Sequence, residues 1–308
     1  MRMIHDDEVD TGEPVVRALL LEQCPQWTQR PLRPLGGTGT DHAMWRLGDH
    51  LVVRVPRTEG AAASLAQEAG ALGAVAPLVP VAVPRLVHFG EPAAAYPYPW
   101  AVLSWLDGRD AWDARHDLDR DDVGLADDLA DVVLALRGAP ALDVPLRGTG
   151  QRGGPVEGVL QRAHAWLDGA SGPLPGWVDA GAVTSVLAAS RAVAEQAPRA
   201  VPSVLTHGDL IPGNILVRGS RLRAVIDWGY LSRADPALDL ACAWALLGPQ
   251  ARSVLRERVG ADDATWERAR VNALEQALGG IVYYTPRGHP LADVMGRTLR
   301  RALADRPR

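Results

Sequence analysis

The segment that decides the fold lies in the second half of the chain, where residues 204–229 have the sequence VLTHGDLIPGNILVRGSRLRAVIDWG. Three apolar runs in it predict short strands, at 204–206, 215–217 and 224–226, and the glycine-serine pair before the third run predicts a tight turn. Side chains with oxygen atoms stand at the ends of these runs: Asp209, Asn214 and Asp227. Because a hairpin pairs neighbouring strands, we expect these three side chains to lie close together.

This set of two carboxylates and one amide matches what phosphoryl transfer requires. One carboxylate must accept the proton of an attacking hydroxyl, while another carboxylate and an amide hold Mg²⁺ against a triphosphate. Protein kinases carry an Asp, an Asn five residues later, and then Asp-Phe-Gly. Asp209 and Asn214 have that spacing, and Asp227 begins an Asp-Trp-Gly triplet in the place of Asp-Phe-Gly.

The ordered motifs resemble the aminoglycoside phosphotransferase family of antibiotic kinases. The resemblance rests on His-Gly-Asp-x-x-Pro-Gly-Asn over 207–214, Val-Ile-Asp-Trp-Gly over 225–229 and Asp-Pro-Ala-Leu-Asp-Leu-Ala over 235–241. It implies a protein-kinase-like two-lobed α+β fold. Residues 1–106 would form the N-lobe, a small antiparallel nucleotide-binding sheet with one helix. Residues 107–308 would form a mainly helical C-lobe with the catalytic loop and the acceptor site.

The same resemblance implies a role for each motif residue. Asp209 would be the catalytic base, and Asn214 and Asp227 would hold Mg²⁺. The reaction would move the γ-phosphoryl group of ATP or GTP to a hydroxyl of a small molecule. His207 is expected to brace the loop by hydrogen bonding, and Asp235 and Asp239 are expected to be structural, fixing the loop.

The chain departs from kinases at the lysine of the sheet. The chain contains no lysine, and the matching strand reads Val-Val-Arg-Val-Pro over 52–56, which places Arg54 there. An arginine keeps the charge and can hold phosphate oxygens with its fork. Its expected partner is Glu68, fourteen positions later on the following helix; Glu59, at the start of that helix, is the less favoured candidate. The alternative is that Arg54 is a surface charge at a strand end.

Other parts of a nucleotide site are expected in the first half of the chain. The glycine-rich turn contains Gly36, Gly37 and Gly39, whose backbone amides would cover phosphates; an ordinary hairpin turn explains these glycines equally well. The segment from Leu103 to Leu106 resembles the kinase hinge, so the backbone near Ser104 and Leu106 would bond the nucleobase edge.

The hydrophobic pattern predicts the helices and strands that surround these residues. A helix is predicted over 13–23, three strands over 32–56, a helix over 58–73 capped by Thr58, and two strands over 85–90 and 100–105. The sequence then becomes helical in pattern, with helices expected within 113–137, near 157–168, over 179–197 and from 264 onward. The change of character places the lobe boundary near residue 106.

The acceptor is specified least. One candidate is a run of six aspartates, Asp110, Asp113, Asp117, Asp119, Asp121 and Asp122. These side chains would attract a polycationic aminoglycoside, or they form a solvated acidic loop. Five tryptophans would line an apolar pocket that suits a macrolide, or pack in the core: Trp112, Trp166, Trp177, Trp244 and Trp266. The Tyr283–Tyr284 pair is expected to border the same cleft.

Composition limits the classes that remain. The chain has 308 residues, 47% hydrophobic and 22% charged, which predicts a folded globular protein rather than a disordered one. The formal charge of −5 disfavours a nucleic-acid partner. No apolar run has the length of a membrane span, the N-terminus has no signal-peptide core, and the two cysteines do not form a disulfide framework, so a cytoplasmic location is expected.

Two alternatives to an antibiotic kinase stay open. A metabolic kinase acting on choline, homoserine or a sugar would have the same fold. A nucleotide-binding pseudokinase without transfer activity is suggested by Arg54. A protein kinase is disfavoured, because Asp227-Trp-Gly is followed almost directly by Asp235-Pro-Ala and leaves no room for an activation segment. The sequence leaves the oligomeric state open.

Overall fold

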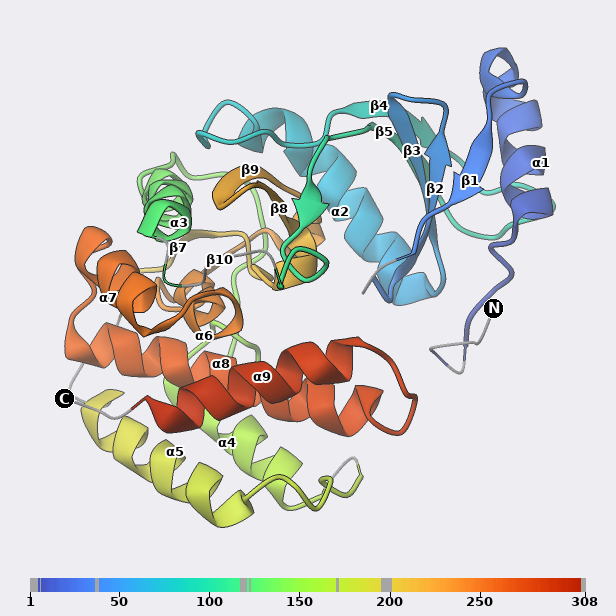
Figure 1. Cartoon of the computed structure of the whole chain (residues 1–308). Coiled ribbons are helices and arrows are strands. Elements are labelled where there is room, and N and C mark those ends of the chain that lie inside the picture. The colour runs from blue at the N-terminus through green and yellow to red at the C-terminus, as the bar shows by residue number, and fades with distance from the viewer. Residues whose placement is uncertain are drawn as a thin grey trace.

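A computed structural model describes residues 5, 7–36, 39–116, 121, 123–169, 172–194 and 201–305. Figure 1 shows two lobes, one built around a sheet and the other mainly of helices. The architecture is therefore α+β and kinase-like, as the motifs predicted. No described helix is long and apolar enough to cross a membrane.

The first lobe is built on a five-stranded antiparallel sheet with strand order β1-β2-β3-β5-β4. The predicted strands form at β1(Leu32–Pro34), β2(His42–Leu47), β3(Leu51–Pro56), β4(Leu86–Gly90) and β5(Trp100–Ser104). Register is well defined at the centre, where Arg54 lies opposite Met44 on β2 and Ala101 on β5.

Two helices pack on this sheet, at the two places where the hydrophobic pattern predicted helices, whereas the family resemblance implied one. Val53 and Val55 of β3 share a buried cluster with α1(Glu13–Gln23), while Val52 belongs to the cluster that contains α2(Glu59–Val75). Side chains alternate along a strand. Arg54 therefore points to the same face as Val52, toward α2. Thr58 caps α2 as predicted, accepting a hydrogen bond from Ala61 N–H.

The chain leaves the first sheet after β5 and joins the second lobe at β6(Arg109–Asp110), which pairs with β8(Ile215–Arg218). The hairpin partner of β8 is β9(Arg221–Val225), and β7(Val204–Thr206) pairs with β10(Ser232–Ala234). Because this crossing falls at residues 105–108, we keep residue 106 as the proposed lobe boundary. β6 and β10 are too short for the sequence pattern to have indicated them.

Helices make up most of the second lobe. Those that the pattern predicted are α3(Val123–Arg137), α4(Val156–Leu167), α5(Ala180–Ala194), α8(Asp263–Tyr284) and α9(Leu291–Ala304). Two more, α6(Cys242–Leu246) and α7(Pro249–Arg258), connect the catalytic segment to α8. Helix α8 is buried along most of its length and contacts α4, α5 and α9, so it forms the core of the lobe. Both cysteines, Cys24 and Cys242, are free and buried.

Candidate active site

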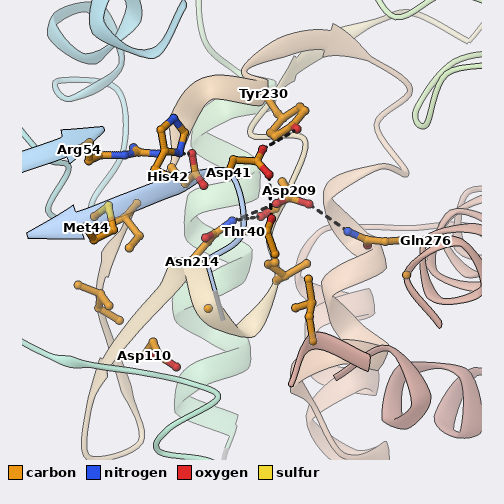
Figure 2. Close-up of a pocket in the computed structure, with 18 of the residues that line it drawn as sticks. Thr40, Asp41, His42, Met44, Arg54, Asp110, Asp209, Asn214, Tyr230 and Gln276 are labelled. Carbon is orange, nitrogen blue, oxygen red and sulfur yellow. Dashed lines mark hydrogen bonds and ion pairs between the residues drawn. The ribbon is translucent and has the colours of Figure 1, made fainter. Parts of the chain in front are cut away.

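A cavity of about 850 Å³ lies between the first sheet and the helical lobe. One side of it, which we call the sheet wall, is formed by Leu35, Met44, Val52, Arg54 and Leu103. The opposite side, the helix wall, is formed by Arg152, Trp166, Glu275, Gln276, Tyr284 and Met295. Asp209, Asn214 and Asp227 all line the cavity between the two walls, and Figure 2 shows Arg54 and Gln276 on opposite sides of Asp209 and Asn214. The three predicted side chains are thus brought together.

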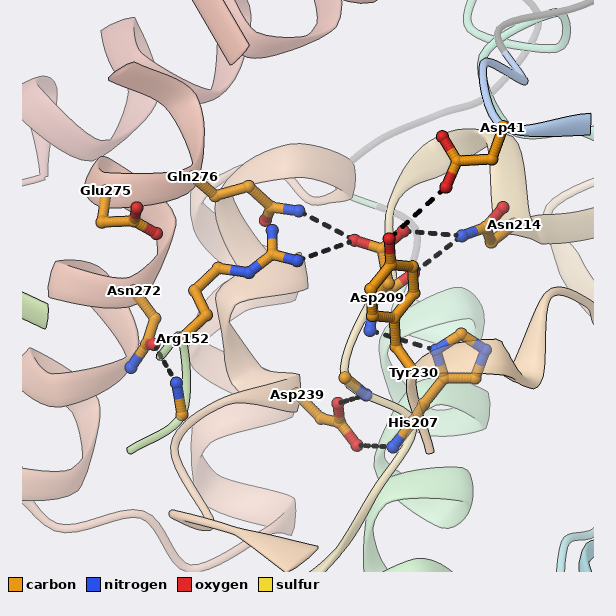
Figure 3. Close-up of polar contacts among 12 residues, drawn as sticks. Asp41, Arg152, His207, Asp209, Asn214, Tyr230, Asp239, Asn272, Glu275 and Gln276 are labelled. Atoms are coloured by element: carbon orange, nitrogen blue, oxygen red, sulfur yellow. Dashed lines mark hydrogen bonds and ion pairs between the residues drawn. The ribbon is translucent and has the colours of Figure 1, made fainter. Parts of the chain in front are cut away.

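The loop before Asp209 is held by one buried carboxylate. Asp239 accepts hydrogen bonds from His207 N–H at 2.8 Å and from Gly208 N–H at 2.9 Å (Figure 3). Gly208 has φ +85°, and a Cβ there would meet Tyr230 O at 2.6 Å, so only glycine fits this turn. The loop is therefore fixed by Asp239, which agrees with the structural role expected for it.

His207 connects the loop to β9. Its Nε2–H donates to Ile226 O at 3.1 Å, which leaves Nδ1 to accept from Asp209 N–H at 3.2 Å. The ring also packs edge-on against Trp228, with the ring centroids 4.6 Å apart. The histidine thus contacts backbone and aromatic groups on both sides, which matches the bracing role expected for it.

Both oxygens of Asp209 are engaged. Oδ2 accepts from Asn214 Nδ2 at 3.1 Å, and Oδ1 accepts from Gln276 Nε2 at 3.0 Å and lies 3.4 Å from Arg152 Nη2. Burial raises the pKa of Asp209 above its ordinary value, and Arg152 opposes that rise. A carboxylate with a raised pKa that faces a cavity is suited to accepting a proton.

Asn214 and Asp227 lie next to each other because β8 and β9 pair. Ile226 N–H donates to Asn214 O at 3.0 Å, which places the following residue beside the asparagine. Asp227 has φ 65°, the sole described non-glycine residue with positive φ. A left-handed aspartate carries backbone strain and is typical of functional sites. Close packing continues at Gly229, where a Cβ would lie 2.1 Å from Ser64 Oγ of α2.

The residues present fit a magnesium ion. Asn214 turns its Nδ2 toward Asp209, which leaves its Oδ1 on the other side, and Asp227 engages Arg54 through Oδ1 alone. Carboxylate and amide oxygens are the ligands that Mg²⁺ prefers, with phosphates and water completing the shell. Across the described residues no group of three or more His, Cys, Asp or Glu side chains is placed to hold a metal. The donor set therefore fits a metal that enters with a nucleotide, not one held by the protein alone.

Arg54 occupies the centre of a buried ion-pair network. Its Nη1 donates to Glu68 Oε2, and its Nη2 donates to Asp227 Oδ1 at 2.9 Å. Glu68 is fully buried and also accepts from Trp228 N–H at 3.0 Å. Burial alone would lower the pKa of Arg54, but Glu68 and Asp227 outweigh it and hold that pKa above the ordinary value. Arg54 is thus a buried group paired with Glu68, not a surface charge.

His42 is a third partner of Arg54. Arg54 Nη2 lies 3.0 Å from His42 Nδ1, and His42 Nε2 lies 3.2 Å from Ala61 O in the first turn of α2. Burial and the neighbouring guanidinium lower the pKa of His42 to about 3. The ring is therefore neutral, with Nε2–H donating to Ala61 and Nδ1 accepting from Arg54. This arrangement fixes the orientation of the guanidinium.

The expected nucleotide-binding backbone also borders the cavity. Gly39 lines it together with Gly36, whereas Gly37 lies outside the described residues. Ser104 and Leu106 both line it. Ser104 N–H already donates to Arg85 O at 2.9 Å, and its Oγ accepts from Arg85 N–H at 2.9 Å. No described residue accepts a hydrogen bond from Leu106 N–H, so that group remains available to a base edge.

Only some of the side chains considered for binding the acceptor line the cavity. Of the aspartates, Asp110 and Asp113 line the cavity, while Asp121 bonds Gln250 N–H; Asp117, Asp119 and Asp122 lie outside the described residues. Of the five tryptophans, Trp166 alone lines it. Trp112, Trp244 and Trp266 are buried in the core, so for these three the core alternative holds, and Trp177 is 51% exposed and does not line the cavity. Tyr283 and Tyr284 border the cavity as expected.

Several residues of the site were missed by the sequence analysis. Arg152 and Gln276 reach Asp209 from the helix wall, and His42 bonds Arg54. Asp41, beside the glycine-rich turn, accepts from Tyr230 Oη at 3.4 Å. Arg152 lies in a Gly/Arg-rich loop, which gave the only available signal; the other residues carry no motif.

Comparison with known proteins gives three kinds of result. A family model described as the phosphotransferase enzyme family (APH) matches residues 32–274. No curated protein matches. Among solved structures, the GDP complex of aminoglycoside 2'-phosphotransferase-IIIa is similar with TM-score 0.75 and 17% identity, covering 96% of this chain and 99% of that one. Macrolide 2'-phosphotransferase MphH from Brachybacterium faecium is similar with TM-score 0.61 and 23% identity, covering 94% and 99%.

Proposed function

This chain belongs to the phosphotransferase enzyme family and is a small-molecule kinase, and from that premise we propose that it moves the γ-phosphoryl group of ATP or GTP to a hydroxyl of its acceptor. One observation carries the proposal. Asp209, Asn214 and Asp227 converge on a single cavity, with Arg54 beside Asp227. Such an arrangement places a base, a pair of metal ligands and a phosphate-binding cation around one point.

Asp209 is the base in this proposal. The acceptor hydroxyl gives its proton to Asp209 as its oxygen forms a bond to the γ-phosphorus. The bond from that phosphorus to the bridging oxygen breaks, and the nucleoside diphosphate leaves with the electron pair. The fixed loop supports this role, because Asp239 and His207 hold the backbone on either side of the carboxylate.

Arg54 holds phosphate oxygens in place of the kinase lysine. Its guanidinium is oriented by Glu68 and His42, so it presents its charge in one direction. Asn214 and Asp227 hold Mg²⁺, which neutralises phosphate charge when it is bound. Two oxygens, Asn214 Oδ1 and Asp227 Oδ2, have no described protein partner, which supports their role as metal ligands.

The nucleobase lies against the sheet wall. Met44, Val52 and Leu103 give this wall an apolar face on which a planar base packs. Leu106 N–H is the donor to the base edge, because the N–H of Ser104 is already bonded to Arg85. Adenine and guanine both offer an acceptor atom on that edge, so both nucleotides belong in the assay.

The acceptor is a hydroxyl compound of a size that shares the cavity with a nucleotide. The similar structures differ in what their names state: one is a kanamycin complex, another is a macrolide 2'-phosphotransferase. Antibiotics of both types therefore belong in the assay as candidate acceptors, with choline, homoserine and sugars as the metabolic alternative.

The test is a panel of these compounds incubated with ATP or GTP and Mg²⁺, read by the mass increase of one phosphoryl group. We expect the wild-type protein to phosphorylate at least one of these compounds. The Asp209→Asn variant should phosphorylate none of them. Nucleotide binding in calorimetry without transfer to any compound, water included, would identify a pseudokinase and contradict the proposal.

A further inference from the structure

The helix wall of the cavity carries an arginine that touches the carboxylate of the base. Arg152 Nη2 lies 3.4 Å from Asp209 Oδ1, the oxygen that also accepts from Gln276 (Figure 3). The other oxygen of Asp209 faces Asn214. An acceptor hydroxyl that reaches Asp209 from the helix wall would therefore lie near the guanidinium of Arg152.

The loop that carries Arg152 is fixed at the next residue, Gly153. Gly153 N–H donates to Asn272 Oδ1 at 2.9 Å, and Gly153 O accepts from Asp235 N–H at 2.8 Å. Gly153 has φ +75°, and a Cβ there would lie 2.5 Å from Leu238 Cδ2. The loop thus packs against the segment that follows the catalytic strands, and the position of Arg152 is built into the fold.

The charges around Asp209 on this side are predominantly positive. Arg147 also lines the cavity, and its hydrogen bonds at the guanidinium go to neutral groups, Ser232 Oγ at 3.0 Å and Tyr230 O at 3.1 Å. Burial and the charge of Arg152 lower the pKa of Arg147, which indicates a cation without full compensation. Glu275, the described carboxylate on the helix wall, is paired with Arg162 at 2.7 Å. On this side, therefore, the guanidiniums of Arg147 and Arg152 lie near Asp209, and Glu275 keeps Oε2 without a described hydrogen-bond partner.

Part of the helix wall is apolar. Gly279 and Gly280 of α8 line the cavity, and a Cβ on them would lie 3.0 Å from Trp166 Cε2 and 2.5 Å from Met295 Cγ. The bare helix backbone lets Trp166 and Met295 pack closely against α8. An apolar body is the chemistry that this surface suits.

We propose that Arg152 determines acceptor specificity: the site takes a neutral or acidic hydroxyl compound with an oxygen beside the reacting hydroxyl, and it excludes compounds with an ammonium group there. The inference rests on the proposed function, because it assigns Asp209 to the acceptor side. A guanidinium donates to hydroxyl, carbonyl or carboxylate oxygens and repels an ammonium in the same place.

The test measures binding of a polycation and its uncharged counterpart by calorimetry, in the presence of Mg²⁺ and a non-hydrolysable nucleotide. The probes are kanamycin and fully N-acetylated kanamycin, which share one scaffold. We expect Arg152→Glu to bind kanamycin at least tenfold more tightly than the wild type, with a smaller gain for Arg152→Gln. The gain should decrease as NaCl is raised, and the acetylated probe should show none.

Arg218→Glu is the matched control, since Arg218 is exposed at the end of β8 and has the same change of charge. Tight kanamycin binding by the wild type, no gain in either Arg152 variant, or an equal gain in Arg218→Glu would each overturn the inference. Circular dichroism establishes whether each variant is folded. If Arg152→Glu is not folded, the kanamycin affinity of Arg152→Gln relative to the wild type decides the test. Nucleotide binding in the same samples reports on the proposed function separately, because Arg152 lies on the wall opposite Arg54.

Discussion

The sheet wall and the helix wall of the cavity are opposite in charge. On the sheet wall a single cation, Arg54, lies between two carboxylates, Glu68 and Asp227. Toward the helix wall two cations, Arg147 and Arg152, lie near Asp209, while Glu275 of that wall is paired with Arg162. In the proposed mechanism the first arrangement would be completed by a divalent cation arriving with a nucleotide, and the second by an oxygen-rich acceptor. The comparison teaches that electrostatics as well as shape would separate the two proposed substrates.

The largest expected effect comes from Asp209, which lies between the walls. Asp209→Asn should lower kcat by about 10³-fold, since the asparagine cannot accept the proton, while the nucleotide Kd stays within about threefold. Steady-state kinetics and calorimetry measure the two quantities. A kcat near that of the wild type would remove Asp209 from the mechanism.

The same variant should be more stable than the wild type at neutral pH. Burial raises the pKa of Asp209 in the folded state. Above the ordinary pKa of an aspartate the ionised carboxylate therefore lowers the free energy of unfolding. This destabilisation disappears as the pH falls and the carboxylate is protonated. Thermal unfolding should therefore give Asp209→Asn the higher Tm at pH 8, with the difference shrinking toward pH 4. A difference that grows on acidification would contradict the assignment.

The second effect concerns the cation of the sheet wall. Arg54→Gln leaves the buried Glu68 and the partly exposed Asp227 without their cation, which should destabilise the fold by about 3–5 kcal/mol. Arg54→Lys keeps the charge but not the fork, so we expect a fold that persists, a raised KM for nucleotide and a kcat lower by about tenfold or more. Urea unfolding and kinetics are the measurements, with the exposed Arg33→Lys as control. Wild-type kinetics for Arg54→Lys would show that the network does not require arginine.

A smaller effect is expected beneath the catalytic loop. Asp239→Asn replaces one of the two acceptors for His207 and Gly208 N–H by an amide donor, which should cost about 1–3 kcal/mol of unfolding free energy. Misplacement of the loop should lower kcat by roughly tenfold without changing the KM for nucleotide. An equal rise in KM would mean that the loop also supports the sheet wall.

The smallest effect on activity is expected at His42. His42→Asn loses the bond to Arg54, so we expect a rise of roughly threefold in the KM for nucleotide at pH 7.5, from a bond worth about 0.5–1.5 kcal/mol. The pH dependence is more informative. A histidine with its pKa lowered to about 3 stabilises the fold above the ordinary histidine pKa and loses that stabilisation as the pH falls.

Between pH 7 and pH 5 this linkage amounts to about 2 kcal/mol of unfolding free energy in the wild type. His42→Asn should lack that part of the acid sensitivity, which urea unfolding at the two pH values measures. If both proteins lose the same unfolding free energy between these pH values, the pKa of His42 does not differ between the folded and unfolded states.

The two walls also differ in how far they could be predicted. Arg54, Glu68, Asn214 and Asp227 follow from short motifs on strands and a helix whose periodicity is clear in the sequence. The five-stranded sheet, the hairpin of β8 and β9, and the long helices α8 and α9 were indicated in the same way. Local patterns suffice where neighbouring strands bring motif residues together.

The helix wall could not be derived in this way. Arg152 comes from a loop with no periodic pattern, and Gln276 is one polar residue of a helix buried along most of its length. Their approach to Asp209 depends on packing between segments that are 57 and 67 positions from it in the sequence. The five tryptophans were left between the pocket and the core for a related reason, since composition does not tell which aromatic side chain faces a cavity and which faces the core.

The division of the buried residues into two clusters has a consequence for motion. Val52 and α2 belong to the cluster that continues into the helical lobe, while Val53, Val55 and α1 form a separate one. Helix α2 is therefore packed into the core that continues through the helical lobe, whereas α1 is packed against the sheet alone. Amide hydrogen exchange should accordingly be slowest in α2 and α8, and faster in α1, which can open without disturbing the larger cluster.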